Sequence, residues 1–249
     1  MGQNTFQLIL ATDLDGTFLE GDHQTKNFLY NKLMQLREEV MLVYVTGRPI
    51  NIVEQFCRQG YLPSSHFVIG DHGTHIVDGN HFQPVDHLQT PIIEKWNSGN
   101  DIIRSLLRED MGIQLQPLDP PYRVAYYYDP QYFQTTTLDK IYSAGYDAIL
   151  SCDMYLDIVP RGVNKGSTLL NLLNDLNISH DDVITAGDSL NDLSLFQTGL
   201  KSIVVGNAEP KLLSETRALK NVYHSNHPGL SGIIEGLNYY EKLHLFSLG

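Results

Sequence analysis

The chain has 249 residues, of which 42% are hydrophobic and 18% charged, so it is long enough and apolar enough to fold around a substantial core. Its 29 acidic and 17 basic residues give a formal net charge of −12, which argues against nonspecific binding to nucleic acid or to an anionic membrane. With no basic-then-apolar leader and no apolar run of 18 residues, we expect a cytoplasmic protein, either a monomer or a small homo-oligomer.

The first third of the chain alternates between apolar strands and amphipathic helices. The expected elements are a strand at 7–12, a helix at 25–39, a strand at 40–46, a helix beginning near Pro49, a strand at 66–70 and a hairpin at 75–84 that turns at Asp78 and Gly79. This order is typical of a parallel sheet with helices between its strands.

The middle of the chain has a different pattern. The expected elements are a helix within 92–108, strands at 112–118 and 123–129, a helix at 133–144, and a strand pair at 146–160 that turns at Asp153 and Met154. The order helix–strand–strand occurs twice, which predicts a small α+β module of two similar halves. We assign this module to residues 86–161.

After Pro160 the alternation of strands and helices returns. The expected elements are helices at 166–178, 191–199, 210–217 and 229–246 and strands at 182–189 and 201–207. Residues 1–85 and 162–249 together therefore predict an α/β core with a Rossmann-like, doubly wound parallel sheet. Such sheets bind their ligands beyond the carboxyl ends of the strands.

Two aspartates stand at the end of the first predicted strand, in the stretch Asp13-Leu-Asp15-Gly-Thr. Carboxylates at the end of a buried strand are costly unless a cation lies between them. Mg²⁺ prefers such oxygen ligands, and a carboxylate can also attack phosphorus, with a second acid near the leaving oxygen. The alternative is a turn in which both side chains only cap backbone amides.

Three further motifs are predicted at or near strand ends. Thr46, Gly47 and Arg48 follow the second strand, where a hydroxyl and a backbone amide can bind phosphate oxygens or simply cap a helix. Lys165 stands at a helix start, where its charge opposes the helix dipole unless it faces an anion or solvent.

The third of these motifs contains Asp188, Asn191 and Asp192 in a strand-to-helix turn. Asp188 is placed to complete a metal site with Asp13 and the Asp15 carbonyl, and Asp192 to hold Lys165 by a charge-assisted hydrogen bond. A simple capping turn is the alternative.

The four motifs, in their order and spacing, resemble those of the haloacid dehalogenase (HAD) superfamily of phosphohydrolases, and the inserted module resembles a cap of the C2B type, which marks subclass IIB. The resemblance implies Asp13 as nucleophile, Asp15 as general acid and base, and Mg²⁺ held by Asp13, the Asp15 carbonyl and Asp188. It also implies that Thr46 and Lys165 stabilise the transferring phosphoryl group. The expected phosphate contacts are Thr46, Gly47, Arg48, Lys165 and Asn191, with Asp192 in a supporting role.

Within this subclass, the stretches at 45–49, 123–129 and 156–166 look most like the sucrose-phosphatase group, which implies a small phosphorylated sugar as substrate. The stretch at 70–76, Gly-Asp-His-Gly-Thr-His-Ile, departs from that pattern, so the sugar stays open. Broad-specificity Cof-like, trehalose-phosphate and mannosyl-phosphoglycerate phosphatases share the architecture. A phosphomutase and a non-catalytic sugar-phosphate sensor are the distant alternatives.

Strand alternation gives candidate sugar contacts in the cap. The more apolar faces should pack on the cap helices, which leaves Arg123, Tyr127 and Asp157 to meet sugar hydroxyls. Five histidines between 66 and 87 suggest a zinc site only weakly, because a hairpin would scatter them over both faces. The two cysteines, Cys57 and Cys152, are expected to be buried reduced thiols.

Overall fold

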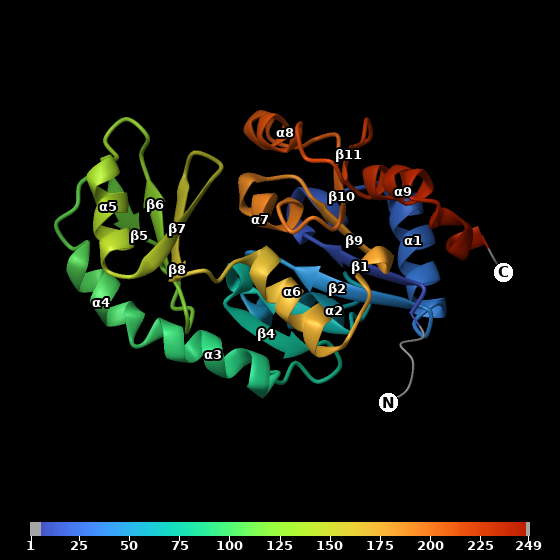
Figure 1. Cartoon of the computed structure of the whole chain (residues 1–249), viewed down its shortest axis with the longest axis horizontal. Coiled ribbons are helices and arrows are strands. Elements are labelled where there is room, and N and C mark those ends of the chain that lie inside the picture. The colour runs from blue at the N-terminus through green and yellow to red at the C-terminus, as the bar shows by residue number, and fades with distance from the viewer. Residues whose placement is uncertain (1–5, 248–249) are drawn as a thin grey trace.

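The computed structural model describes residues 6–247, which form two β-sheets, each with its own helices (Figure 1). The larger sheet has seven strands in the order β11-β10-β9-β1-β2-β3-β4. These strands are β1 (Leu8–Thr12), β2 (Val40–Val45), β3 (Phe67–Gly70), β4 (His75–Asp78), β9 (Val183–Gly187), β10 (Lys201–Val204) and β11 (Val222–His224). All neighbouring pairs are parallel except β3 and β4. The α/β core with a doubly wound parallel sheet is confirmed.

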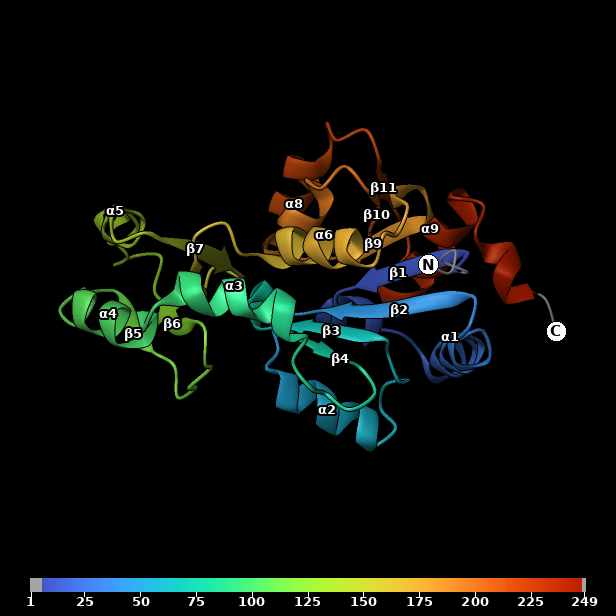
Figure 2. The ribbon, with the colours of Figure 1, turned by 60° about the horizontal axis from the view of Figure 1, so that its bottom comes forward.

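Helices cover both faces of this sheet because its strands are apolar on both sides. Helices α1 (His23–Gln35), α2 (Ile50–Arg58) and α9 (Gly229–Tyr239) share one hydrophobic cluster with Leu8, Leu10 and Leu42. Helices α6 (Lys165–Asp175) and α7 (Leu193–Phe196) pack on the other face, against Ile9 and Val43. Figure 2 shows α6 on one side of the strands and α1 and α2 on the other. Helix α8 (Pro210–Thr216) packs beside α7.

The smaller sheet is antiparallel, with the strand order β5-β6-β8-β7. Its elements are α3 (Asp86–Trp96), α4 (Gly99–Leu106), β5 (Ile113–Leu115), β6 (Val124–Tyr128), α5 (Thr135–Ser143), β7 (Tyr146–Ser151) and β8 (Tyr155–Pro160). Val124, Tyr126, Leu156 and Ile158 pack with side chains of the three helices, so the apolar sheet face meets the helices as predicted. We call this unit the cap and the rest of the described chain the core.

The chain passes from the core to the cap through α3, which contacts both β4 and β8, and returns from β8 to α6 (Figure 1). The boundaries at residues 85/86 and 161/162 remain our prediction. No helix within residues 6–247 is long and apolar enough to cross a membrane.

Three sequence expectations differ from the structure. The single helix expected within 92–108 is two helices, α3 and α4, because Asn97 and Ser98 both adopt left-handed backbone angles, with φ of 41° and 62°. The hairpin partner of β4 is β3, joined through residues 71–74, while the turn at Asp78 makes only a single bridge beyond β4. Strand β11 was not predicted, because it has only three residues at the sheet edge.

The order of the larger sheet brings the predicted site together. Strands β2 to β4 lie on one side of β1 and β9 to β11 on the other, so the strand order reverses beside β1. Thr12, the last residue of β1, is in register with Tyr44 of β2 and Ala186 of β9. The residues that follow these three strands therefore meet at one edge, where open α/β sheets bind ligands.

Candidate active site

Asp13 follows β1 and is fixed to the neighbouring strand, since its backbone N–H donates to the Ala186 carbonyl at 2.9 Å. The chain then turns sharply through Gly16, whose φ of +73° favours glycine. A Cβ at Gly16 would lie 2.3 Å from Oδ2 of Asp188. Glycine is therefore needed here both for the turn and for the close approach of the Asp188 carboxylate.

Lys165 is the positive centre of the site. Its side chain is 1% exposed, and its ammonium donates to Asp13 Oδ1 at 2.7 Å and to Asp192 Oδ1 at 2.6 Å. A third bond goes to the side-chain oxygen of Asn191. The sequence interpretation in which Lys165 faces an anion at a helix start agrees with this geometry, and the solvated-lysine alternative does not.

Burial and electrostatic interactions shift the pKa values of the groups around Lys165. Burial raises the pKa of Asp13 well above its usual value, and this outweighs the opposite effect of Lys165. Burial, followed by repulsion from Asp192, raises the pKa of Asp188 to about 7. Burial would lower the pKa of Lys165, but Asp13 and Asp192 more than compensate and raise it. Ionising all three carboxylates would therefore give the site more negative charge than Lys165 alone neutralises.

Asp188 and Asp192 are held in different ways. Asp192 Oδ2 accepts from the backbone N–H groups of Asp188 and Ser189, both at 3.1 Å, so this carboxylate is occupied by the turn and by Lys165. Asp188 Oδ1 accepts from the hydroxyl of Thr17 at 2.8 Å. Thr17 is fully buried and orients Asp188, a role that the sequence reading did not assign to it.

The carboxylates fit a hard divalent cation. Oxygen atoms of Asp13, Asp188 and Asp192 all lie within 4.8 Å of one another. If all three are ionised, they leave two negative charges beyond the one that Lys165 neutralises, which matches the charge of Mg²⁺, an ion that prefers carboxylate oxygens. Asp13 and Asp188 have carboxylate oxygens available to bind the cation. Those of Asp192 already accept from Lys165 and two backbone amides.

Arg48, on the loop after β2, is a second positive group at the site. It donates through two nitrogens to the two carboxylate oxygens of Asp15, at 2.7 Å and 2.5 Å, and its guanidinium stacks 5.0 Å from the ring of Phe56. The hydroxyl of Thr46 accepts from the Arg48 backbone N–H at 3.1 Å. Helix α2 begins only at Ile50, with Pro49 as its N-cap, so the alternative of Thr46 as a helix cap is wrong.

A cavity of about 470 Å³ lies between these core residues and the cap sheet. Eight predicted residues line it: Asp13, Asp15, Gly47, Arg48, Arg123, Asp157, Asp188 and Asn191. Thr46, Lys165 and Asp192 are buried and do not line this cavity. Tyr127 is 38% exposed and does not line it either. Alternation gave the right sheet face, but Tyr127 lies behind the cavity's edge, beside Tyr155, its partner on β8, which does line the cavity.

A family model described as sucrose-6F-phosphate phosphohydrolase matches residues 6–241. The chain belongs to this family of phosphatases. The solved structure of the sucrose-phosphatase from Synechocystis sp. PCC6803, in complex with sucrose and phosphate, superimposes with a TM-score of 0.85 at 26% identity, covering 95% of this chain and 98% of that one. The resemblance to HAD phosphatases of the sucrose-phosphatase group is confirmed.

Two similar proteins carry enzyme names other than sucrose-phosphatase. The chain is 36% identical over 234 residues to a glucosylglycerol-phosphate synthase from Pseudomonas anguilliseptica, covering 94% of this chain but 31% of the synthase. It is 28% identical to a mannosylfructose-phosphate phosphatase from Agrobacterium fabrum, covering 93% of this chain and 96% of the relative. The chain thus spans about a third of the first relative and nearly all of the second.

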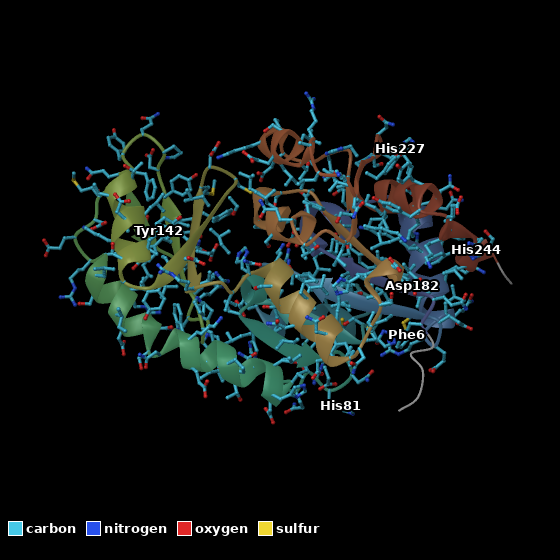
Figure 3. All side chains as sticks on the ribbon, viewed as in Figure 1. Phe6, His81, Tyr142, Asp182, His227 and His244 are labelled. Carbon is cyan, nitrogen blue, oxygen red and sulfur yellow. The ribbon has the colours of Figure 1, made fainter. Side chains whose placement is uncertain are left out.

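Several residues that line the cavity were not predicted as site residues, among them His72, Gln116, Ser151, Tyr155 and Glu209. His72 falls in the stretch at 70–76 that departs from the expected pattern. Among residues 6–247, the group of three side chains that could hold a metal ion contains no histidine, and His81 lies at the periphery on the loop after β4 (Figure 3). Both cysteines are free thiols. Cys57 is half-buried, but Cys152 is exposed at the β7–β8 turn and lines the cavity, which corrects the expectation of burial.

Proposed function

We propose that this chain is a Mg²⁺-dependent phosphomonoester hydrolase that acts on a phosphorylated disaccharide or glycoside through an aspartyl-phosphate intermediate. The observation that supports it best is the buried ammonium of Lys165, which is bonded to Asp192 and to Asp13, a residue that lines the cavity between the core and the cap. Phosphoryl transfer depends mostly on such positioning and electrostatics.

In the proposed first step, Asp13 attacks the phosphorus. Its Oδ1 accepts from Lys165, and its Oδ2 accepts no hydrogen bond from residues 6–247, so one oxygen is free to act as nucleophile. Asp15 gives its proton to the leaving sugar oxygen and later takes one from the water that hydrolyses the aspartyl-phosphate. For Asp15 to carry that proton, one of its two bonds to Arg48 must open, because both carboxylate oxygens accept from Arg48 in this structure.

The phosphate itself would lie between Lys165, the Thr46 hydroxyl, the Gly47 amide and Asn191. Asp13, the Asp15 backbone carbonyl and Asp188 would hold Mg²⁺, with Thr17 orienting Asp188. When bound, the ion neutralises charge on the phosphoryl oxygens.

The leaving group would occupy the cap side of the cavity. The cavity volume of about 470 Å³ falls within the range of about 300–1,000 Å³ that is typical of small-molecule sites. Gln116, Ser151 and Tyr155 give its cap side hydrogen-bonding groups, as a hydroxyl-rich sugar requires. The names of the relatives suggest three substrates to compare: sucrose-6F-phosphate, mannosylfructose phosphate and glucosylglycerol phosphate.

The test is phosphate release from these three compounds and from glucose-6-phosphate, with Mg²⁺, with EDTA and with Ca²⁺. We expect one of the glycosyl phosphates to be preferred, EDTA to abolish release, and Ca²⁺ not to restore it because Ca²⁺ prefers more ligands and a looser geometry. Release in EDTA at the full rate would exclude the metal site. Isomerised sugar phosphate without free phosphate would instead identify a mutase.

A further inference from the structure

Arg123 lies at a buried junction between the cap and the core. Its side chain is 4% exposed, and each of its three guanidinium nitrogens has an acceptor. Nε donates to Asp71 Oδ1 at 2.9 Å, one terminal nitrogen pairs with Asp157 Oδ1, and the other donates to the Gly47 carbonyl at 3.4 Å. One cap side chain thus joins a second cap residue to two separate core loops.

Asp157, on cap strand β8, has partners at both of its oxygens. Oδ1 accepts from Arg123, and Oδ2 lies 3.2 Å from Nε2 of His72. Although burial acts in the opposite direction, His72 and Arg123 together hold the pKa of Asp157 below its usual value. Its carboxylate is therefore ionised and committed to protein partners, which leaves it poorly suited to act as a free acceptor for a sugar hydroxyl.

His72 packs directly on Gly47. A Cβ at Gly47 would lie 2.6 Å from Cε1 of the His72 ring, so the ring fills the space that a larger residue would need. Asp71 and His72 both adopt left-handed backbone angles, with φ of 50° and 59°. Such conformations cost free energy in non-glycine residues and persist only where the surroundings hold them.

The peptide of Gly47 is therefore held from two sides: the His72 ring packs on its Cα, and Arg123 donates to its carbonyl. Both side chains are bound by the same carboxylate, Asp157. Gly47 belongs to the loop whose amide and preceding Thr46 hydroxyl would bind the transferring phosphate.

We infer that Asp157, Arg123 and His72 are positioning residues that hold the Gly47 peptide in its phosphate-binding geometry and so couple the placement of the cap to the phosphate site. This inference rests on the proposed function and replaces the expectation that Arg123 and Asp157 read sugar hydroxyls. Their effect should be felt by every phosphate ester, since the phosphate loop serves all substrates equally.

The test compares Asp157→Asn with wild type on the preferred sugar phosphate and on p-nitrophenyl phosphate, together with inhibition by inorganic phosphate. We expect kcat to fall for both substrates, by roughly 100-fold if the loop shifts by about an ångström, and phosphate to inhibit more weakly. The matched control is Asp110→Asn. Asp110 is another buried cap carboxylate, 5% exposed, which pairs with Lys140 and Thr137 within the cap. Its substitution should leave both rates and phosphate inhibition unchanged.

A second variant, His72→Gln, keeps a hydrogen-bonding side chain but removes the ring from Gly47, and it should weaken phosphate inhibition in the same way. If Asp157→Asn raises only the KM for the sugar phosphate and spares the small ester, Asp157 is a sugar contact and the inference is overturned. It is equally overturned if Asp157→Asn does not fold and inorganic phosphate inhibits His72→Gln as strongly as it inhibits the wild type. A wild-type protein that hydrolyses neither ester would instead refute the proposed function.

Discussion

Lys165 and Asp13 lie 152 positions apart in the chain, and the Lys165 ammonium donates to Oδ1 of Asp13 at 2.7 Å. The contact arises because β1 ends beside the start of α6, where Asn164 caps the helix and directs the next residue inward. A buried ammonium so placed serves two purposes: it lowers the repulsion among carboxylates and offers a positive group to a phosphoryl oxygen.

Replacing Lys165 with methionine keeps much of the side-chain volume and removes the charge. We expect kcat to fall by about 100- to 1,000-fold, as is common when one preorganised donor is lost. The matched control is Lys242→Met, since Lys242 also pairs with an aspartate, Asp182, at 2.8 Å on the core surface. Phosphate release should be nearly normal in the control, and an active Lys165→Met variant would remove this residue from the mechanism.

Gly16→Ala should abolish activity through a specific collision. The added Cβ would meet the Asp188 carboxylate at 2.3 Å, in addition to the strain of a positive φ. Gly60→Ala isolates the strain, because Gly60 has a φ of +75° and no atom within 4 Å of the added Cβ. Both variants should lose about 1–2 kcal/mol of unfolding free energy from backbone strain. Only Gly16→Ala should lose phosphatase activity, and equal activity in the two would exclude the collision as important.

Thr17→Val tests how Asp188 is oriented for the metal. Without the hydroxyl bond at 2.8 Å, Asp188 is less well held, so the Mg²⁺ concentration for half-maximal rate should rise about 10-fold or more. Thr216→Val is the control, because Thr216 is also fully buried but bonds to the Leu212 carbonyl in α8. An unchanged Mg²⁺ requirement in Thr17→Val would show that this bond does not matter.

The four motifs on the core could be predicted because each lies within a few residues of a strand end, and strand order then brings them together. The network around His72 could not. Asp71 and His72 adopt left-handed conformations, which Asp and His accept more readily than most residues but do not require, and their partners come from the cap, 52 and more positions later. Likewise, alternation predicted the face of Arg123 and Tyr127 but not that, of the two, only Arg123 lines the cavity.

The helix break at Asn97 and Ser98 was missed for a similar reason. Apolar spacing continues from Trp96 to Ile103, so the pattern reads as one helix. The break is a property of two polar residues that accept positive φ, and Gly99 then packs against the ring of Trp96. Local sequence allows such a break but does not require it.

Glu235, away from the active site, should make the stability of the fold depend on pH. A hydrogen bond from Ser225, with further bonds from Tyr223 and Asn226, lowers the pKa of Glu235 to about 2 from its ordinary 4.5. Because the folded-state pKa is depressed, the stabilisation is present above about pH 4.5 and is lost as the pH falls toward 2. In urea unfolding, the free energy of unfolding of Glu235→Gln should be lower than that of wild type. This difference should be largest near pH 7 and should shrink below pH 4.5. The exposed Glu94→Gln variant should show no such trend, and a constant deficit would contradict the assignment.

The nucleophile is the central claim, and Asp13→Asn tests it most directly. The amide keeps the size of the side chain and removes the charge that attacks phosphorus, while the fold should survive because, without a bound cation, an amide relieves the repulsion from Asp192 and Asp188. The measurement is the rate of phosphate release from the preferred glycosyl phosphate with saturating Mg²⁺. We predict a loss of several orders of magnitude with an unchanged unfolding transition, and near-normal turnover in a folded Asp13→Asn protein would contradict the account.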